Sequence, residues 1–254
     1  MISDPISDNI SDKISDSISD PILSAIFRRR AIRLFEPVEI PACTRDLLLR
    51  SARQAPSSFN TQPYRLYWVE SPAQREAVAK LCLGQNATQT ASALVVAVAD
   101  IGSLRSTSQM QVAWMRERGL PARKIREYVF TAWIGRVLFA PGPLNLFAAL
   151  KRALFRLLHV FKTTGLPPLT RQDVFKWAGK STALACQNLM TTAEVLGLNT
   201  CPMEGFDGQR LGEYLGLSRK YQEIVMVIAM GKKSANYVEQ PQWRRPIETT
   251  VTVL

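Results

Sequence analysis

The spacing of apolar residues along the chain predicts helices that alternate with short strands. The first helix is expected to begin at Asp20-Pro21, because aspartate caps helices and proline suits the first helical position. It ends in the basic run Arg28-Arg29-Arg30, and its apolar positions recur at helical spacing. These apolar positions are Ile22, Leu23, Ile26 and Phe27. A second helix is predicted over residues 44–54, ahead of Pro56, with Leu47, Leu48 and Ala52 pointing inward.

Strands are predicted in three places by short apolar or aromatic runs. Residues 64–69 form one strand, followed by a helix over 72–83. Residues 93–99 are a continuous valine-rich run, which is typical of a strand buried on both faces. A similar run over 224–230 is expected to end at Gly231.

The longest predicted helix covers residues 173–196, with Gly197 as its C-terminal cap. Its expected buried stripe is Val174, Trp177, Ala178, Leu184, Ala185, Leu189 and Val195. Its small residues, which would allow another helix to approach closely across a dimer axis, are Ala178, Gly179, Ser181, Ala183 and Ala185. Residues 247–254 are β-prone and are expected to form an edge strand that pairs beyond its own subunit. This mixture of helices and short strands predicts an α+β fold, with residues 21–254 as a single domain.

Residues 101–170 differ from the rest because they are both basic and apolar. Helices are predicted over 122–139 and 144–161, on either side of Ala140-Pro141-Gly142-Pro143. Neither apolar run reaches the roughly 18–20 residues that a membrane-spanning helix needs. Two interpretations remain: a lid packed on the core, or an amphipathic element that contacts a membrane surface through 122–162.

Charge and composition leave several partner classes open. Hydrophobic residues make up 46% of the chain and charged residues 21%, as in ordinary globular proteins, but the formal net charge is +11. An anionic cofactor, a membrane surface or nucleic acid could balance this charge. Nucleic acid is disfavoured because the polar motifs described below lack interleaved aromatic and basic residues.

The numbers and spacing of cysteine and histidine residues exclude some kinds of metal site. The four cysteines contain no C-x-x-C pair, and His159 is the single histidine, so a multi-histidine metal site is excluded. We therefore expect reduced, mostly buried thiols and a cytoplasmic protein. Residues 1–20 repeat Ile-Ser-Asp at a period of four residues, without the basic start or apolar run of a secretory signal. A disordered tail is favoured there over a helix, because serine, aspartate and Pro5 disfavour helix interiors.

Two polar turns far apart in the sequence are the candidate binding elements. One spans residues 55–64 and the other 196–207, and both are rich in hydroxyls, amides and accessible backbone N–H groups. Such turns suit a site that holds a polar, ring-shaped, phosphorylated ligand. Taken singly, each motif has a simpler explanation. The arginines after residue 27 could complement a helix dipole, the first turn could consist of ordinary turn formers, and Glu204-Gly205 could precede a helix capped by Asp207.

The order and spacing of these motifs resemble the nitroreductase family of FMN-dependent oxidoreductases. The resemblance covers roughly residues 22–100 and 170–250. The matching segments are Arg29-x-x-x-Arg33-x-Phe35, Pro56-Ser57-Ser58-x-Asn60-x-Gln62-Pro63, Trp177, Gly197-Leu198-x-x-x-Pro202-x-Glu204-Gly205-Phe206, and Arg244. The resemblance implies a nitroreductase-like fold with a central mixed or antiparallel sheet flanked by helices. It also implies a homodimer with a long interface helix and an FMN at the interface, in which the C-terminal strand pairs with the partner subunit.

The resemblance also assigns roles to individual residues. Arg29 and Arg244, with Arg30, would bind the FMN phosphate, and Arg33 would lie near the flavin N1–O2 edge. Pro56, Ser57, Ser58 and Asn60 would reach the FMN from the other subunit. The remaining cofactor-binding candidates are Ala31, Gln62, Pro202, Glu204 and Gly205, the last two with their backbone near the flavin N5. NAD(P)H would reduce the flavin and leave, and a nitroaromatic or quinone would then accept the electrons in a ping-pong mechanism.

Three departures from the family pattern concern the cofactor site. Ala31 stands where a serine is usual, and Gln242 stands where a lysine is common. The polar pair that normally precedes the strand at 93–99 has no clear match, and Gln85, Asn86 and Gln89 are the available substitutes. Two alternatives to nitro or quinone reduction therefore remain open. One keeps the flavin but carries out dehalogenation or flavin cleavage, and the other is a non-enzymatic basic protein that binds a membrane surface.

Overall fold

The computed structural model describes residues 20–139, 153–154, 157 and 170–254. Its centre is a five-stranded sheet in which all neighbouring strands are antiparallel. The strands are β1 (Phe35–Glu36), β2 (Tyr64–Val69), β3 (Ala93–Asp100), β4 (Asn199–Met203) and β5 (Gln222–Lys233). They follow the order β1-β5-β3-β2, and β4 pairs with β5 beside β1. The predicted α+β class is confirmed, and of the two predicted kinds of sheet the antiparallel one is observed.

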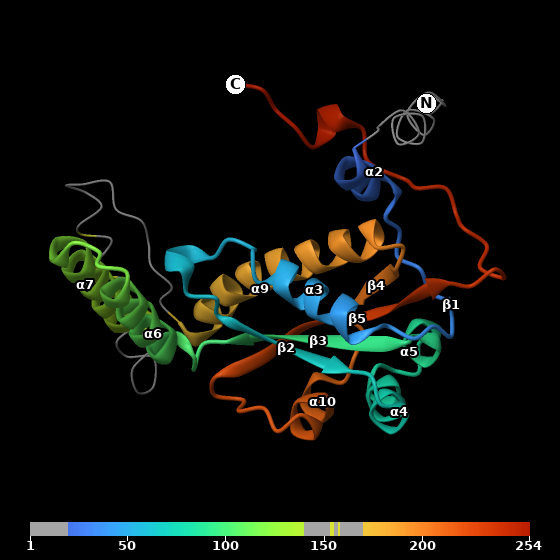
Figure 1. Cartoon of the computed structure of the whole chain (residues 1–254), viewed down its shortest axis with the longest axis horizontal. Coiled ribbons are helices and arrows are strands. Elements are labelled where there is room, and N and C mark those ends of the chain that lie inside the picture. Colours follow the sequence, from blue (N-terminus) through green and yellow to red (C-terminus); the bar gives the residue numbers. More distant parts are fainter. Residues whose placement is uncertain (1–19, 140–152, 155–156, 158–169) are drawn as a thin grey trace.

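Helices cover both faces of the sheet (Figure 1). They are α2 (Pro21–Arg28), α3 (Ala42–Ala52), α4 (Pro72–Leu81), α5 (Asn86–Thr90), α6 (Leu104–Glu117), α7 (Ala122–Phe139), α9 (Arg171–Val195) and α10 (Gly208–Tyr214). Two 3-10 turns cover Ser58–Asn60 and Ile247–Thr249. One face of the sheet packs against α3 and α9, and the other against α4, α5 and α10. No helix in the described part of the chain is long and apolar enough to cross a membrane.

The valine-rich strand β3 explains why the sheet is covered on both sides. All eight of its residues are buried. Successive side chains of a strand point to opposite faces. Leu94 and Val96 therefore pack with the α4–α10 layer, while Val95 and Ala97 pack with the α3–α9 layer. The predicted buried strand is confirmed.

Helix ends follow the predicted capping chemistry. The Asp20 carboxylate accepts backbone N–H bonds of 2.8 and 2.9 Å at the start of α2. Gly197 follows α9 at φ +75°, and the next amide donates to the carbonyl of Ala193 at 2.8 Å, which closes the helix. The Asp207 carboxylate accepts from the N–H of Arg210 at the start of α10. The three local signals are confirmed.

Several side chains predicted to be buried are exposed in the single chain. Leu47 on α3 and both Leu184 and Val195 on α9 were predicted to be buried and are exposed. The predicted apolar face of α2 is uncovered too, since Ile22, Leu23 and Ile26 are each about half exposed and Ala25 is the buried residue. The spacing of apolar residues shows that a helix has an apolar face, but it does not show that the same chain covers that face.

Two strand predictions were wrong in detail. β5 does not end at Gly231 but continues to Lys233, because Lys232 and Lys233 pair with β1, and Phe35 of β1 packs directly over this glycine. A Cβ atom at position 231 would lie 3.1 Å from the Phe35 side chain, so the glycine permits this contact. Near the C-terminus, residues 247–249 form a 3-10 turn and residues 250–254 carry no strand pairing in this single chain. Pairing of this segment with a partner subunit stays a prediction.

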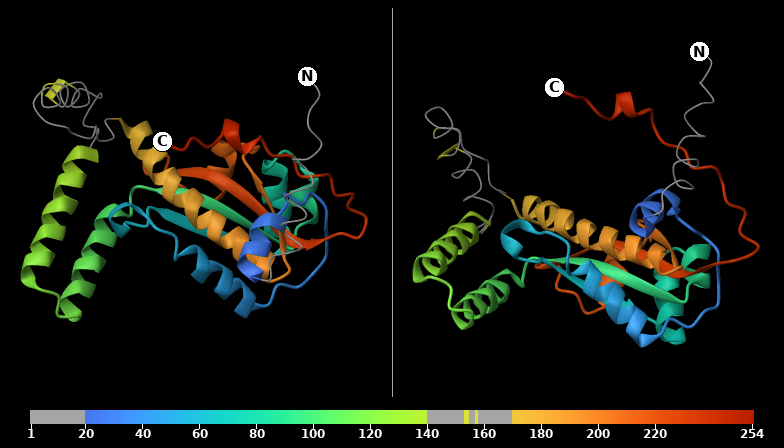
Figure 2. Two further views of the ribbon diagram at one scale, coloured as in Figure 1. Left: turned by 90° about the horizontal axis from the view of Figure 1, so that it is seen from above. Right: turned by 45° about the horizontal axis from the view of Figure 1, so that its top comes forward.

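The predicted lid is in part a helical hairpin. The helix expected over residues 122–139 is α7, which packs against α6. Figure 2 shows this pair standing to one side of the sheet. The predicted helix over 144–161 lies outside the described residues apart from 153–154 and 157, and so does His159. The predicted tail at residues 1–19 also lies outside them.

The burial of adjacent residues on α3 predicts opposite responses to truncation. Leu48 is fully buried and Leu47 is 49% exposed. Leu48→Ala should lower the free energy of unfolding by about 2–5 kcal/mol, because it leaves a cavity between α3 and the sheet. The matched control Leu47→Ala should change it by less than about 0.5 kcal/mol. Urea denaturation followed by circular dichroism measures both, and equal losses would contradict the assigned burial.

Candidate functional site

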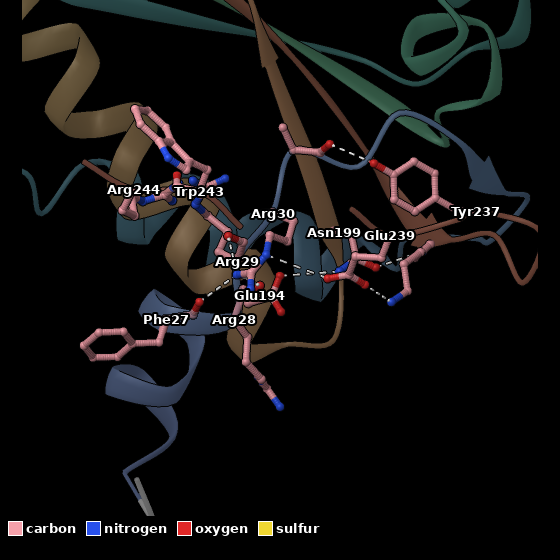
Figure 3. A network of polar contacts seen from close by, with 12 residues as sticks. Phe27, Arg28, Arg29, Arg30, Glu194, Asn199, Tyr237, Glu239, Trp243 and Arg244 are labelled. Carbon is pink, nitrogen blue, oxygen red and sulfur yellow. Dashed lines mark hydrogen bonds and ion pairs between the residues drawn. The ribbon is translucent and has the colours of Figure 1, made fainter. Parts of the chain in front are cut away.

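Two arginines from opposite ends of the chain meet beside the last turn of α9. Arg29 caps the C-terminus of α2, and Arg244 lies in the C-terminal segment (Figure 3). Burial lowers the pKa of Arg29, and the nearby charge of Arg244 lowers it further. The Nη1 atom of Arg29 is buried and has no hydrogen-bond partner among the described residues. Two adjacent guanidinium groups with an unsatisfied buried donor form a site that an anion would stabilise.

A carboxylate faces the same arginines and is one of two residues that the sequence analysis missed. Glu194 lies in the last turn of α9, where a negative charge is unfavourable toward the helix dipole. Burial raises its pKa, while Arg28, a hydrogen bond from Asn199 and Arg29 oppose that shift. An acidic residue in the final turn of a helix was the signal that could have identified it.

Asn199 connects this charged cluster to the sheet and is the second residue missed. Its amide nitrogen donates to Glu194 at 3.4 Å, and its amide oxygen accepts from the backbone N–H of Lys233 at 2.8 Å. The end of α9, the start of β4 and the end of β5 are thereby held together. Arg28 and Arg29 lie next to this junction, because both act on the charge of Glu194.

Arg30 has a different role from its neighbour in this structure. Its Nη1 atom donates to the backbone carbonyls of Phe27 and Arg28 at 2.8 and 2.9 Å. Its Nε atom lies 3.9 Å from the carboxylate of Glu239, which also binds Lys233 at 2.6 Å. Arg30 therefore satisfies carbonyls at the C-terminus of α2 and joins an ion-pair network (Figure 3).

The segment after Arg30 runs alongside β4. Ala31 forms a parallel bridge with Thr200, and the N–H of Ile32 donates to the Thr200 carbonyl at 3.1 Å. The next arginine, Arg33, hydrogen-bonds the buried Cys201 thiol. Burial raises the pKa of that thiol, and Arg33 and Arg29 partly offset the effect. A positive strip thus follows the first residues of β4.

The second predicted polar turn contains a strand. Residues 199–203 form β4, in which Pro202 is partly buried, and only the residues on either side of the strand are turns. Glu204 and Gly205 follow the strand and are exposed. Gln85 Nε2 donates to the carbonyl of Gly205 at 2.7 Å, and a Cβ atom at this glycine would lie 3.1 Å from that nitrogen. Of the three candidate substitutes for the missing polar pair, Gln85 therefore contacts the predicted site.

The first predicted turn lies at the other end of α9 and has an unusual backbone. Phe59, Asn60 and Gln62 have φ values of 55°, 52° and 44°. Left-handed conformations at several non-glycine residues concentrate at functional sites. The hydroxyl of Ser57 accepts from the Gln62 N–H at 3.0 Å, and Gln62 Nε2 donates to Asn60 Oδ1 at 3.1 Å.

Within one chain the structure brings together only part of the predicted set. Arg29, Ala31, Arg33 and Arg244 gather around the first residues of β4, and Glu204-Gly205 follows the end of that strand. Pro56, Ser57, Ser58, Asn60 and Gln62 form the separate group. Figures 1 and 2 show the two groups at opposite ends of α9.

Comparison with known proteins gives consistent matches. The model of the nitroreductase family matches residues 26–232. Protein DrgA of Synechocystis is 28% identical over 212 residues, which cover 83% of each chain. The oxygen-insensitive NAD(P)H nitroreductase of Salmonella typhimurium is 25% identical and covers 91% of this chain and 98% of its own. A protein from Exiguobacterium sibiricum, solved in complex with FMN, superposes with a TM-score of 0.68 at 20% identity, covering 93% of this chain and 98% of its own.

The burial of the cysteines predicts their reactivity. Burial raises the pKa of Cys82 to about 11 and that of Cys186 to about 12, and it raises the pKa of Cys201 as well. A raised pKa leaves a thiol protonated and unreactive at pH 8, whereas Cys43 is exposed. Titration of the native protein at pH 8 with Ellman's reagent should therefore show one fast thiol per chain and three that react only after unfolding.

Cys43→Ser is the control for this titration, because it should remove the fast phase without changing the slow one. More than one fast thiol in the native protein would contradict the burial of the other three cysteines.

Proposed function

The chain belongs to the nitroreductase family, and from this premise we propose that it is an oxidoreductase that transfers a hydride from NAD(P)H through bound FMN to a nitroaromatic or a quinone. The observation that carries the proposal is that Arg29 and Arg244 lie close together while the Nη1 donor of Arg29 is buried and unsatisfied among the described residues. Arginine binds phosphate oxygens in a bidentate manner, and a dianionic phosphate would offset the repulsion between the two guanidinium groups. The residues present therefore fit an FMN phosphate.

The remaining predicted residues would orient the ring of the cofactor. When bound, FMN supplies the capacity to accept a hydride and to release two electrons. Arg33, held by Cys201, would place positive charge at the N1–O2 edge, where negative charge develops on reduction. Gln85 fixes the carbonyl of Gly205 and would thereby hold the Glu204–Gly205 backbone that we assign to the N5 edge.

The overall reaction that we propose has two halves, as in a ping-pong mechanism. In the first half NAD(P)H gives up a hydride and leaves as NAD(P)⁺. In the second half a nitro group takes up two electrons and two protons, one N–O bond breaks, and a nitroso compound and water leave. A quinone in its place takes up two electrons and two protons to give a hydroquinone. The protein's contribution is to bind and orient both partners in turn.

A homodimer would complete the cofactor site. The turn with Pro56, Ser57, Ser58 and Asn60 lies at the opposite end of α9 from the arginines of its own chain, so we propose that the partner subunit supplies it. The exposed apolar side chains of α2, together with Leu184 on α9 and Trp243 near the C-terminus, are the surfaces that such a dimer would cover. We further propose that residues 21–254 form one domain and that the protein is cytoplasmic, which suits its free thiols.

The first test is the colour of the purified protein. It should be yellow with bound FMN, and NADPH or NADH added without oxygen should bleach the visible flavin absorbance. Addition of a nitroaromatic or a quinone should then restore it, because the two half-reactions are separable. A colourless protein that takes up no added FMN rules the proposal out, and a protein that bleaches but is reoxidised only by halogenated compounds would assign it the alternative reaction.

The second test concerns the phosphate arginines. Arg244→Ala should weaken FMN binding by about 2–3 kcal/mol, or roughly 30- to 150-fold, because it removes a charged partner of the phosphate. The matched control is Arg245→Ala, since Arg245 donates to the carbonyl of Thr249 and is assigned no contact with FMN. Fluorescence titration of the apoprotein with FMN measures both, and unchanged affinity in Arg244→Ala would remove this residue from the site.

A further inference from the structure

A cleft of about 780 Å³ separates the α6 helix from the body of the protein. Its floor is formed by β2 and the turn at residues 57–62, with Tyr64 and Asn60 among the lining residues. One wall is the C-terminus of α3 and the other is the side of α6 that carries Met110 and Trp114. This volume lies within the range of protein sites that hold one- or two-ring molecules.

The charged lining of this cleft is entirely basic. None of the described residues that line it carries a carboxylate, and Arg53 and Arg65 are its two charged residues. Arg65 lies 2.6 Å from the buried carboxylate of Asp100, which neutralises its charge. Arg53 has no ion pair with any described carboxylate, and it lies close enough to Tyr64 to influence its phenol. Arg53 is therefore the cation available to a ligand.

Two amide side chains of the cleft have their oxygens engaged and present their nitrogen donors to it. Gln111 Oε1 already accepts a hydrogen bond of 2.6 Å from Tyr128, so the amide nitrogen of Gln111 is the atom left for the cleft. Asn60 Oδ1 likewise accepts from Gln62, which leaves the amide nitrogen of Asn60. A lining of amide donors and one guanidinium group complements an acceptor-rich, negatively charged ligand.

The apolar lining favours a flat ligand. Trp114 is 52% exposed and Met110 is 63% exposed, although both lie on the side of α6 that faces the cleft. A half-exposed indole beside a cavity provides a surface for stacking an aromatic ring, and a thioether contacts such a ring favourably. The aromatic ring of Tyr64 contributes to the opposite side.

We propose that this cleft binds a planar aromatic anion, with Arg53 as its counter-ion and Trp114 as its stacking surface. Because the turn at 57–62 also belongs to the proposed cofactor site, the bound molecule is the electron acceptor. This last assignment rests on the proposed function, whereas the binding itself does not. The acceptor class is thereby narrowed to aromatic carboxylates, sulfonates or phenolates that carry a nitro or quinone group.

Two isosteric probes separate charge from shape. 4-Nitrobenzoate is a planar anion, and 4-nitrobenzamide has nearly the same shape without the charge. Calorimetric titration of the protein as purified, without NAD(P)H, measures their dissociation constants while no turnover occurs. The anion should bind about five- to tenfold more tightly than the amide, and added salt should weaken only the anion. Equal affinities would overturn the proposal.

Variants locate the site within the molecule. Arg53→Gln should remove the preference for 4-nitrobenzoate and leave 4-nitrobenzamide binding within about twofold. The matched control is Arg50→Gln, an exposed arginine one turn earlier on α3 that does not line the cleft, and it should change neither constant. Trp114→Ala should weaken both probes about three- to tenfold through loss of stacking. A charge preference that survives Arg53→Gln would assign it to another site and overturn the proposal.

The test is separable from that of the proposed function. If the protein binds no FMN but still prefers 4-nitrobenzoate through Arg53, the cleft assignment stands and the oxidoreductase proposal fails. If the flavin is reduced and reoxidised normally but the two probes bind equally, the oxidoreductase proposal stands and the cleft assignment fails. If both the cleft assignment and the oxidoreductase proposal hold, Arg53→Gln should raise the KM for 4-nitrobenzoate and leave the KM for 4-nitrobenzamide unchanged.

Discussion

In the middle of the molecule, β3 and β5 pair over eight residue positions, and helices cover both faces of β3. The opposite edge of β5 holds β4 along residues 227–231 and β1 along residues 232–233. Because the segment from Arg29 to Arg33 lies against β4, the positions of these arginines depend on that central pairing. A shift of register by one residue would turn every side chain of the shifted strand to the opposite layer. The burial of both layers therefore sets the geometry of the candidate site.

Around the arginines, the structure balances a concentration of like charge. Arg29 and Arg244 repel each other in a partly buried position, and Glu194 offsets this repulsion from the end of α9. Placing a carboxylate in a final helical turn costs a fraction of a kcal/mol in dipole energy and more in desolvation. Asn199 lowers that cost by donating a hydrogen bond to Glu194, and it also holds the end of β5. Glu194 thus reduces the repulsive cost of bringing the two guanidinium groups together.

The separation of the two polar groups along α9 divides the proposed work between subunits. One end of the helix carries the arginines, and the other end carries the strained turn at 57–62 and the basic cleft beside α6. In a dimer with antiparallel interface helices, the turn of one chain would meet the arginines of the other. The cleft would then lie next to the ring of the cofactor, where an acceptor has to bind. Cofactor binding and acceptor selection would thus be properties of different ends of the same helix.

The sequence alone determined the local structure, that is, where helices are capped and which strand is buried. The caps at Asp20, Gly197 and Asp207 and the buried run at 93–99 depend on nearest neighbours and on side-chain periodicity, and the structure confirms them. The ordered motifs identified the family. What covers each apolar face depends on residues far away in the chain. This is why Leu47 and Leu184 were predicted inward and are exposed, and why β5 runs past Gly231 to pair with β1.

The tertiary structure alone decided which charges meet. Glu194 and Asn199 carry no motif of their own, and their contact with Arg28, Arg29 and the backbone of Lys233 exists only because β4 and β5 bring the segments together. The same holds for the cleft, whose walls come from α3 and α6 on either side of β2. Short-range patterns specify elements because their causes lie within one helical turn or one strand pair. The site lies between elements, and its geometry is therefore set by long-range packing.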